Sequence, residues 1–189
     1  MQSNCISSVC WGRRGACRPR HAALGTQIMK INLIRREHVK GTELMDEILR
    51  LDHDNMRPIF QKIGQEMPID RRKLAFNSPG DIIFARDDDG CLAGYLEYGP
   101  GWDDPKEIYL SSIQIASKNQ NGVVLLLLIR HVIRNCGFVH GQIIKTHVQK
   151  SNETAIQIYK RLGFHVDESS EKNGTLSACM VYPPKWPNL

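Results

Sequence analysis

The chain has 189 residues and a formal net charge of +5, with 41% apolar and 24% charged residues. These values suit one globular domain with a tail. They exclude a membrane-spanning protein, because the longest apolar run, 123–129, is far too short to cross a bilayer. No apolar secretory segment lies near the start, so we expect a soluble, cytoplasmic protein without a membrane partner.

The positive charge is concentrated in residues 1–28, which hold no acidic residue and four arginines: Arg13, Arg14, Arg18 and Arg20. They account for +4 of the +5, which leaves residues 29–189 close to +1. A domain so nearly neutral lacks the basic surface that binds nucleic acid, and we expect no such partner. Nucleic-acid binding through the arginine-rich tail is the alternative. Residues 1–28 have no periodicity, and we expect a disordered basic extension. The alternatives are a transit-like segment and translated upstream sequence.

Periodicity and turn residues define the elements of the first half of the domain. They predict a strand over 30–35, helices over 39–52 and 56–63, a loop over 64–79, and strands over 81–86 and 91–98. The first helix is predicted from the helical spacing of Leu44, Ile48 and Leu51. Asp89-Gly90 between two apolar runs predicts a β-hairpin.

The second half of the domain alternates between strands and helices. We predict a loop over 99–105, a strand over 107–116 whose shifted alternation indicates a bulge, a buried helix over 123–135, a strand over 142–148, a capped helix, a strand over 164–167, a polar turn over 168–174 and a strand over 176–182. The order β-α-α-β-β-β-α-β-α-β-β predicts one α/β (α+β) domain over 29–189, with a mixed sheet between helices.

Residues 148–166 are the most informative segment, and they read as a strand end, a capped helix, a glycine stop and a further strand. Ser151 or Asn152 can accept an amide proton of the first turn, and Gly163 supplies the left-handed stop. One helical face carries Ala155, Ile158, Tyr159 and Leu162. Periodicity alone therefore predicts an amphipathic helix.

Five positions of this segment fit the pattern Asn-x-x-Ala-x-x-x-Tyr-x-x-x-Gly-Phe: Asn152, Ala155, Tyr159, Gly163 and Phe164. The pattern resembles the signature of the GNAT superfamily of acyl-CoA-dependent N-acyltransferases, and the order of elements over 30–182 is that of the GNAT fold. The resemblance implies a mixed, mostly antiparallel sheet and acetyl-CoA as co-substrate. An ordinary surface helix with a core tyrosine is the alternative.

The resemblance also implies a phosphate-binding loop, since GNAT enzymes hold the pyrophosphate of acyl-CoA through Arg/Gln-x-x-Gly-x-Gly/Ala at a helix N-terminus. This chain departs from that pattern, because Gly122 is its one glycine there, and Val123 and Leu125 stand where small residues are expected if Gln120 is first. Backbone amides still supply donors, so we predict a degenerate but working loop; a plain helix start is the alternative. The predicted acetyl-CoA contacts are Ile113, Gln114, Ile115, Gln120, Asn121, Gly122, Val123, Val124, Asn152, Ala155 and Tyr159.

Two residues are predicted to carry the chemistry. By resemblance, the Tyr159 hydroxyl would protonate the leaving CoA thiolate, because a phenol is protonated at neutral pH and can donate. The incoming amine must lose a proton, and Glu97 is the first candidate base, with Glu107 second. A core tyrosine, a solvent-facing glutamate and catalysis by ordered water alone are the alternatives.

Trp102, Asp103 and Asp104 form an acidic, aromatic loop that would suit a cationic amine, although a solvated turn explains it equally well. The acceptor is expected to be a small-molecule or peptide amine. The histidines show no ligand spacing, so no metal is predicted. Edge-strand pairing would allow a homodimer.

The leading hypothesis is therefore an acyl-CoA-dependent N-acetyltransferase in which the amine attacks the thioester directly. The alternative is a non-catalytic module of the same fold that binds acyl-CoA or a partner protein, and the degenerate loop motivates it.

Overall fold

The structure, a computed structural model, describes residues 29–101, 103–120, 122–135 and 140–182. The extension expected over 1–28 lies outside these residues. In chain order the elements are β1 (Lys30–Arg35), η1 (Arg36–His38), α1 (Glu43–Lys62), α2 (Ile69–Ala75), β2 (Asp81–Arg86), β3 (Leu92–Pro100), β4 (Ile108–Ile115), η2 (Ser117–Asn119), α3 (Val123–Asn135), β5 (Ile143–Gln149), α4 (Glu153–Arg161), β6 (His165–Lys172) and β7 (Thr175–Val181), η marking 3₁₀ turns. The predicted order of strands and α-helices is confirmed.

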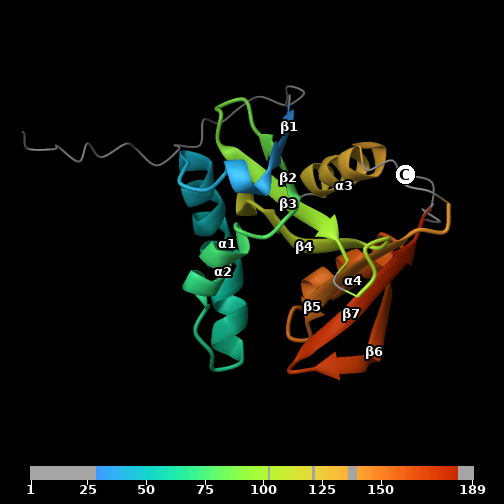
Figure 1. Cartoon of the computed structure of the whole chain (residues 1–189). Coiled ribbons are helices and arrows are strands. Elements are labelled where there is room, and N and C mark those ends of the chain that lie inside the picture. The colour runs from blue at the N-terminus through green and yellow to red at the C-terminus, as the bar shows by residue number, and fades with distance from the viewer. Residues whose placement is uncertain (1–28, 102, 121, 136–139, 183–189) are drawn as a thin grey trace, which may run out of the picture.

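Within the described residues, seven strands form one sheet in the order β1-β2-β3-β4-β5-β7-β6. β4 and β5 run parallel, and the other neighbouring pairs are antiparallel, which confirms the mixed, mostly antiparallel sheet. α1 and α2 lie beside the N-terminal strands, and α4 lies with the C-terminal strands (Figure 1). No described helix combines the length and the apolarity needed to cross a bilayer.

Each face of the N-terminal strands has its own apolar core, because successive side chains of a strand point to opposite faces. On β2, Ile83 belongs to the core formed with α3 and α4, whereas Ile82 belongs to the core formed with α1. The first core continues across β5, β6 and β7 through buried residues such as Val148 and Ala178. α3 and α4 therefore share one face of the sheet, and α1 covers the other.

The predicted positions of the first two helices are wrong. α1 runs unbroken from Glu43 to Lys62 with Pro58 inside it, and α2 lies in the predicted loop. Proline removes one helical hydrogen bond, but Pro58 lies on the exposed side, where water can reach the carbonyl that loses its partner. α2 has no buried residue, so apolar periodicity gives no sign of it.

The predicted polar turn over 168–174 is also too long. β6 continues to Lys172, and the hairpin to β7 turns at two residues, Asn173 (φ 53°) and Gly174 (φ 74°). Two positive φ values in a two-residue loop match the twist of the flanking strands, and Asn-Gly adopts them most readily. The hairpin at Asp89-Gly90 is confirmed, since β2 and β3 pair antiparallel.

Candidate active site

β4 and β5 pair only over a short stretch and then part. Their register contains three pairs, Ile108↔Ile144, Tyr109↔Lys145 and Leu110↔Thr146. The Thr146 hydroxyl donates to the Leu110 carbonyl (2.8 Å) at the last pair. From Ser112 to Ile115, β4 pairs with β3 alone, so part of its backbone faces away from any paired strand. We call the position of Leu110 and Thr146 the strand junction.

The β4 bulge inferred from the sequence is confirmed near this junction. Glu97 of β3 pairs with Ser112, and the next residue, Tyr98, pairs with Leu110, so Ser111 is extra. A bulge changes which face the following residues meet. Ser112 consequently lies on the α1 face, where its hydroxyl is 3.1 Å from the Tyr95 hydroxyl.

Tyr159 projects from α4 to the strand junction. The Asn152 side chain caps α4 by accepting from the Ala155 amide (3.1 Å), and Gly163 takes a left-handed φ of 89° just beyond the helix. The Tyr159 ring is 9% exposed and lies 5.3 Å from the Phe164 ring, centroid to centroid. Thr146 of β5 is also buried, and its side chain is close enough to act on the Tyr159 hydroxyl. Burial raises the pKa of Tyr159, and the Thr146 side chain opposes that rise, so the phenol is protonated at neutral pH and can donate a proton.

The predicted phosphate loop lies between β4 and α3. Gly122 has a left-handed φ of 88°, and its carbonyl accepts the Leu126 amide (3.0 Å) in the first turn of α3. Val124 is 1% exposed and packs in the core beside Gly94, whereas Val123 is 54% exposed. Val124 therefore points away from the loop surface and Val123 remains on it. Asn121 lies outside the described residues.

The predicted acetyl-CoA contacts on β4 are held in place from both sides. Asn55 of α1 donates to the Gln114 side chain and to the Ile115 carbonyl (3.0 Å each), and Gln120 donates to the same carbonyl (3.3 Å). Ile113 and Ile115 pack against the α3 core, as Ala155 of α4 does. Gly94 leaves no room for a side chain at this strand, because an added Cβ would meet the Ile115 side chain at 2.8 Å.

Glu97 lies in a buried network that the sequence analysis did not foresee. Its carboxylate is 1% exposed and accepts from both terminal nitrogens of Arg72, on α2. Arg36 Nη2 lies 3.6 Å from Glu97 Oε2. Arg72 also donates to Asp52 Oδ2 (2.6 Å), and the Tyr95 hydroxyl donates to Asp52 Oδ1. We call these five residues the acid–arginine cluster.

The cluster is strongly perturbed by its burial. Loss of hydration raises the pKa of Asp52, although Arg72 opposes the rise, and it raises the pKa of Tyr95 well above its ordinary value. The two guanidinium groups give Glu97 cationic partners. Its predicted role as a base is not tested by this geometry, but its carboxylate reaches little solvent.

The predicted substrate loop is partly described. Trp102 lies outside the described residues, and Asp103 is exposed. Asp104 has a structural partner, because its Oδ1 accepts the Lys106 amide (2.8 Å) and its carbonyl accepts the Glu107 amide (3.0 Å). Glu107, the second candidate base, lies 3.8 Å from the Lys145 ammonium.

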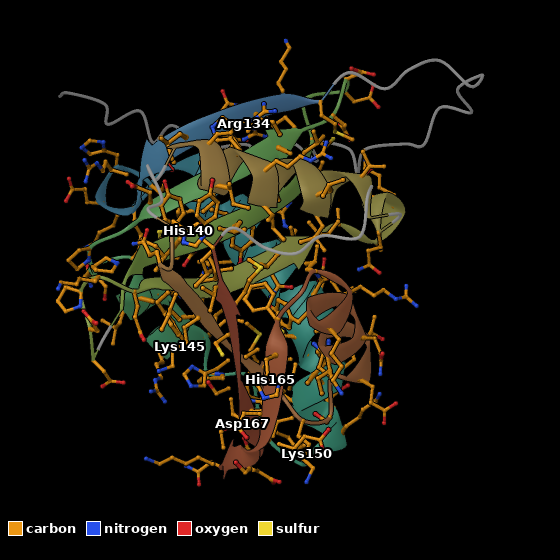
Figure 2. The ribbon with its side chains drawn as sticks, turned by 90° about the vertical axis from the view of Figure 1, so that its right-hand side faces the viewer. Arg134, His140, Lys145, Lys150, His165 and Asp167 are labelled. Atoms are coloured by element: carbon orange, nitrogen blue, oxygen red, sulfur yellow. The ribbon has the colours of Figure 1, made fainter. Side chains whose placement is uncertain are left out.

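A tyrosine–histidine pair beside the junction was missed by the sequence analysis. The Tyr109 hydroxyl of β4 lies 2.9 Å from His147 Nδ1 of β5. Thr146 is buried toward α4, so its neighbour His147 points to the other face of the strand, as does Lys145. Figure 2 shows Lys145 on the side of these strands away from α4. Only the parallel register brings the pair together, and neither spacing nor periodicity reveals it.

Comparison with known families decides the assignment. The family model described as the Acetyltransferase (GNAT) family matches residues 41–164, well over half of the chain. The chain belongs to the GNAT family. The match runs from the start of α1 to Phe164 and so includes the junction, the phosphate loop and α4. The resemblance inferred from the signature helix is confirmed.

Solved structures share the GNAT fold of this chain at low sequence identity. PaiA N-acetyltransferase from Thermoplasma acidophilum, in complex with coenzyme A, has a TM-score of 0.60 and 13% identity over 82% of this chain and 99% of that one. An acetyltransferase from Thermus thermophilus has a TM-score of 0.58 and 18% identity, over 81% of this chain and 96% of that one. ElaA of Escherichia coli has a TM-score of 0.58 and 13% identity, over 80% of this chain and 99% of that one. No protein with a curated description matches the sequence.

Proposed function

We propose that this GNAT protein transfers an acetyl group from acetyl-CoA to a primary amine of a small molecule or peptide. The observation that carries the proposal is the position of Tyr159, which is buried on the α4 face of the sheet beside Thr146, where β4 and β5 part. A protonated phenol beside an unpaired strand edge can donate its proton to the thiolate that leaves when an acyl-CoA bound along that edge reacts. Membership of an acetyltransferase family and a fold shared with a CoA-bound N-acetyltransferase support this choice of donor.

Three parts of the site would hold acetyl-CoA. The backbone of β4 beyond the bulge offers hydrogen-bonding groups to the pantetheine arm, as a strand does to its neighbour. The N-terminus of α3 offers amide donors and a positive dipole to the pyrophosphate. Asn152 and Ala155, at the start of α4, would contact the arm from the far side.

The reaction would be a direct attack of the amine on the thioester carbonyl. The new C–N bond replaces the C–S bond, Tyr159 donates its proton to the leaving thiolate, and the nitrogen of the new amide releases the proton that restores the phenol. Holding the amine and the thioester together supplies much of the rate, since it converts a bimolecular step into a unimolecular one. Asp103 would attract a cationic acceptor. The amine must lose protons, and Glu97 remains a predicted base.

The first experiment is calorimetric titration of the full chain with acetyl-CoA and with CoA, using two glycine variants as a matched pair. Gly122 and Gly141 have left-handed φ values of 88° and 86°, and a Cβ at either would meet nothing within 4 Å. Alanine strains both backbones alike, by roughly 1–2 kcal/mol. Only Gly122 lies at the N-terminus of α3. We expect Gly122→Ala to weaken acetyl-CoA binding by about tenfold or more and Gly141→Ala to leave it unchanged.

The second experiment measures CoA release with spermidine, a lysine peptide, a peptide with a free N-terminus and an amino acid as acceptors. Binding together with amine-dependent release supports the proposal. Binding without release to any amine favours the non-catalytic acyl-CoA module. Absence of binding at millimolar acetyl-CoA contradicts both.

A further inference from the structure

The acceptor amine is an ammonium ion at neutral pH, so some group must take its proton before it can attack. That group must lie near the strand junction, reach solvent, and be unprotonated at working pH. Glu97 satisfies these conditions poorly, because it is 1% exposed and paired with Arg72. The hydrogen-bonded pair Tyr109 and His147 satisfies all three.

The pair lies one residue from the strand junction along both strands. Tyr109 precedes Leu110 on β4, and His147 follows Thr146 on β5. Because side chains alternate along a strand, Thr146 turns toward Tyr159 while His147 turns to the opposite face. An acyl group at the junction would thus meet its proton donor on one face of the sheet and this pair on the other.

The face that carries His147 is open to an incoming amine. His147 lines a surface hollow of about 460 Å³, together with Lys145, Lys172, hydroxyl side chains of β6 and β7 and the amide of Asn173 in the turn between them. None of the described residues that line this hollow belongs to the apolar core, so water and a polar substrate can enter. His147 is itself exposed, in contrast to Glu97.

Charged groups around His147 set its protonation state. Partial burial lowers the pKa of His147, Lys145 lowers it further, and Asp103 opposes them. Lys172 of β6 lines the same hollow and adds positive charge. Burial raises the pKa of Tyr109, so the phenol keeps its proton and can donate it to Nδ1 of a neutral His147. Asp103 would draw the ammonium group toward the pair.

We propose that Tyr109 and His147 form a relay that removes the ammonium proton of the acceptor, an inference that rests on the proposed function. The ammonium N–H passes its proton to Tyr109 Oη, while Tyr109 passes its own proton to His147 Nδ1. The neutral amine then attacks the thioester carbonyl. Of the two protons that the ammonium loses overall, one ends on the CoA thiol and the other leaves through His147 to solvent.

The test uses the full chain saturated with acetyl-CoA and two small probe amines that need no acceptor pocket. Ethylamine is an ammonium ion at neutral pH, whereas methoxyamine is already unprotonated. We expect His147→Gln and Tyr109→Phe each to slow ethylamine-dependent CoA release by about 100-fold. Both should abolish the fall in rate that the wild-type enzyme shows as the pH drops through the pKa of His147. Methoxyamine should rescue both variants.

His165→Gln is the matched control, because His165 is an exposed histidine of the same sheet, on strand β6, and does not line the hollow. It should keep the wild-type rates and pH profile. Wild-type rates in both relay variants, or an equal loss with both amines, would overturn the inference, the latter by indicating a structural role. If Glu97→Gln alone abolishes the fall in rate at low pH, then Glu97 is the group that accepts the ammonium proton. If the wild-type enzyme releases CoA to no probe or screened amine, the proposed function itself fails.

Discussion

In the N-terminal half of the sheet, α1 and α2 cover polar side chains of β3, and ion pairs form there out of reach of solvent. In the C-terminal half, the same face of β5, β6 and β7 carries polar side chains that line an open hollow. Buried charges must be paired, because removing them from water costs several kcal/mol each. In the covered half, polar residues therefore bind the helices to the sheet. In the open half, polar residues remain accessible to a substrate.

Breaking the acid–arginine cluster should produce the largest effect on stability. Arg72→Met leaves the carboxylates of Asp52 and Glu97 buried without their main partner, and we expect a loss of about 3–5 kcal/mol of unfolding free energy. Urea denaturation measures the loss. Arg71→Met, one residue away and exposed, is the control and should change little. A loss equal to that of the control would show that the cluster does not hold α2.

Removing the hydroxyl of each buried tyrosine should have a different effect, on turnover for Tyr159 and on stability for Tyr95. We expect Tyr159→Phe to slow amine-dependent CoA release by about 100-fold, equivalent to about 2.7 kcal/mol of barrier, without changing acetyl-CoA affinity. Tyr95→Phe removes the hydroxyl that binds Asp52 and should lower stability instead. Steady-state kinetics, calorimetry and urea denaturation of both variants test this. Unchanged turnover in Tyr159→Phe would remove Tyr159 from the mechanism.

The cap of α4 should contribute a smaller amount to the free energy of unfolding. Asn152→Ala removes the acceptor of the Ala155 amide, and we expect a loss of about 1 kcal/mol. Asn152→Ser should recover most of it, because serine also caps well. Gln157→Ala, on the exposed side of the same helix, is the control in urea denaturation. If Asn152→Ser is as unstable as Asn152→Ala, the side chain of Asn152 acts through something other than capping.

Local patterns predicted what depends on neighbouring residues in the chain. The order of elements, the extent of α3 and the cap and stop of α4 follow from periodicity, Asn152 and Gly163. Asn173-Gly174 is a dipeptide typical of a two-residue hairpin turn, but the polar residues before it made the end of β6 look like part of a longer turn. α2 has no apolar face to detect, since Arg72 attaches it to Asp52 and Glu97.

Features that depend on distant residues were not predictable. The acid–arginine cluster draws on η1, α1, α2 and β3, and only the folded arrangement shows that Glu97 points into it. Tyr109 and His147 are 38 positions apart and meet through a parallel register that no sequence pattern specifies. The positions of Tyr159 and Asn152 could be predicted because one helix carries both, and their roles in the reaction stay predictions.

The smallest expected effect is a pH dependence of stability from His147. Partial burial and Lys145 hold its pKa below the ordinary 6.5, so the unfolded chain binds a proton more readily than the folded protein. Stability therefore falls as the pH drops below 6.5, and above it this contribution is fully present. We expect the wild-type protein to lose stability relative to His147→Gln between about pH 8 and pH 5, by less than about 0.5 kcal/mol, because solvent screens an exposed group.

Urea denaturation at both pH values measures this difference, with Ser177→Ala as the control, since Ser177 faces His147 across the strand pair and does not titrate. A difference that grows in the opposite direction would mean that the folded protein favours the protonated ring. A larger fraction of His147 would then be protonated at a given pH, which would count against His147 as the proton acceptor of the relay.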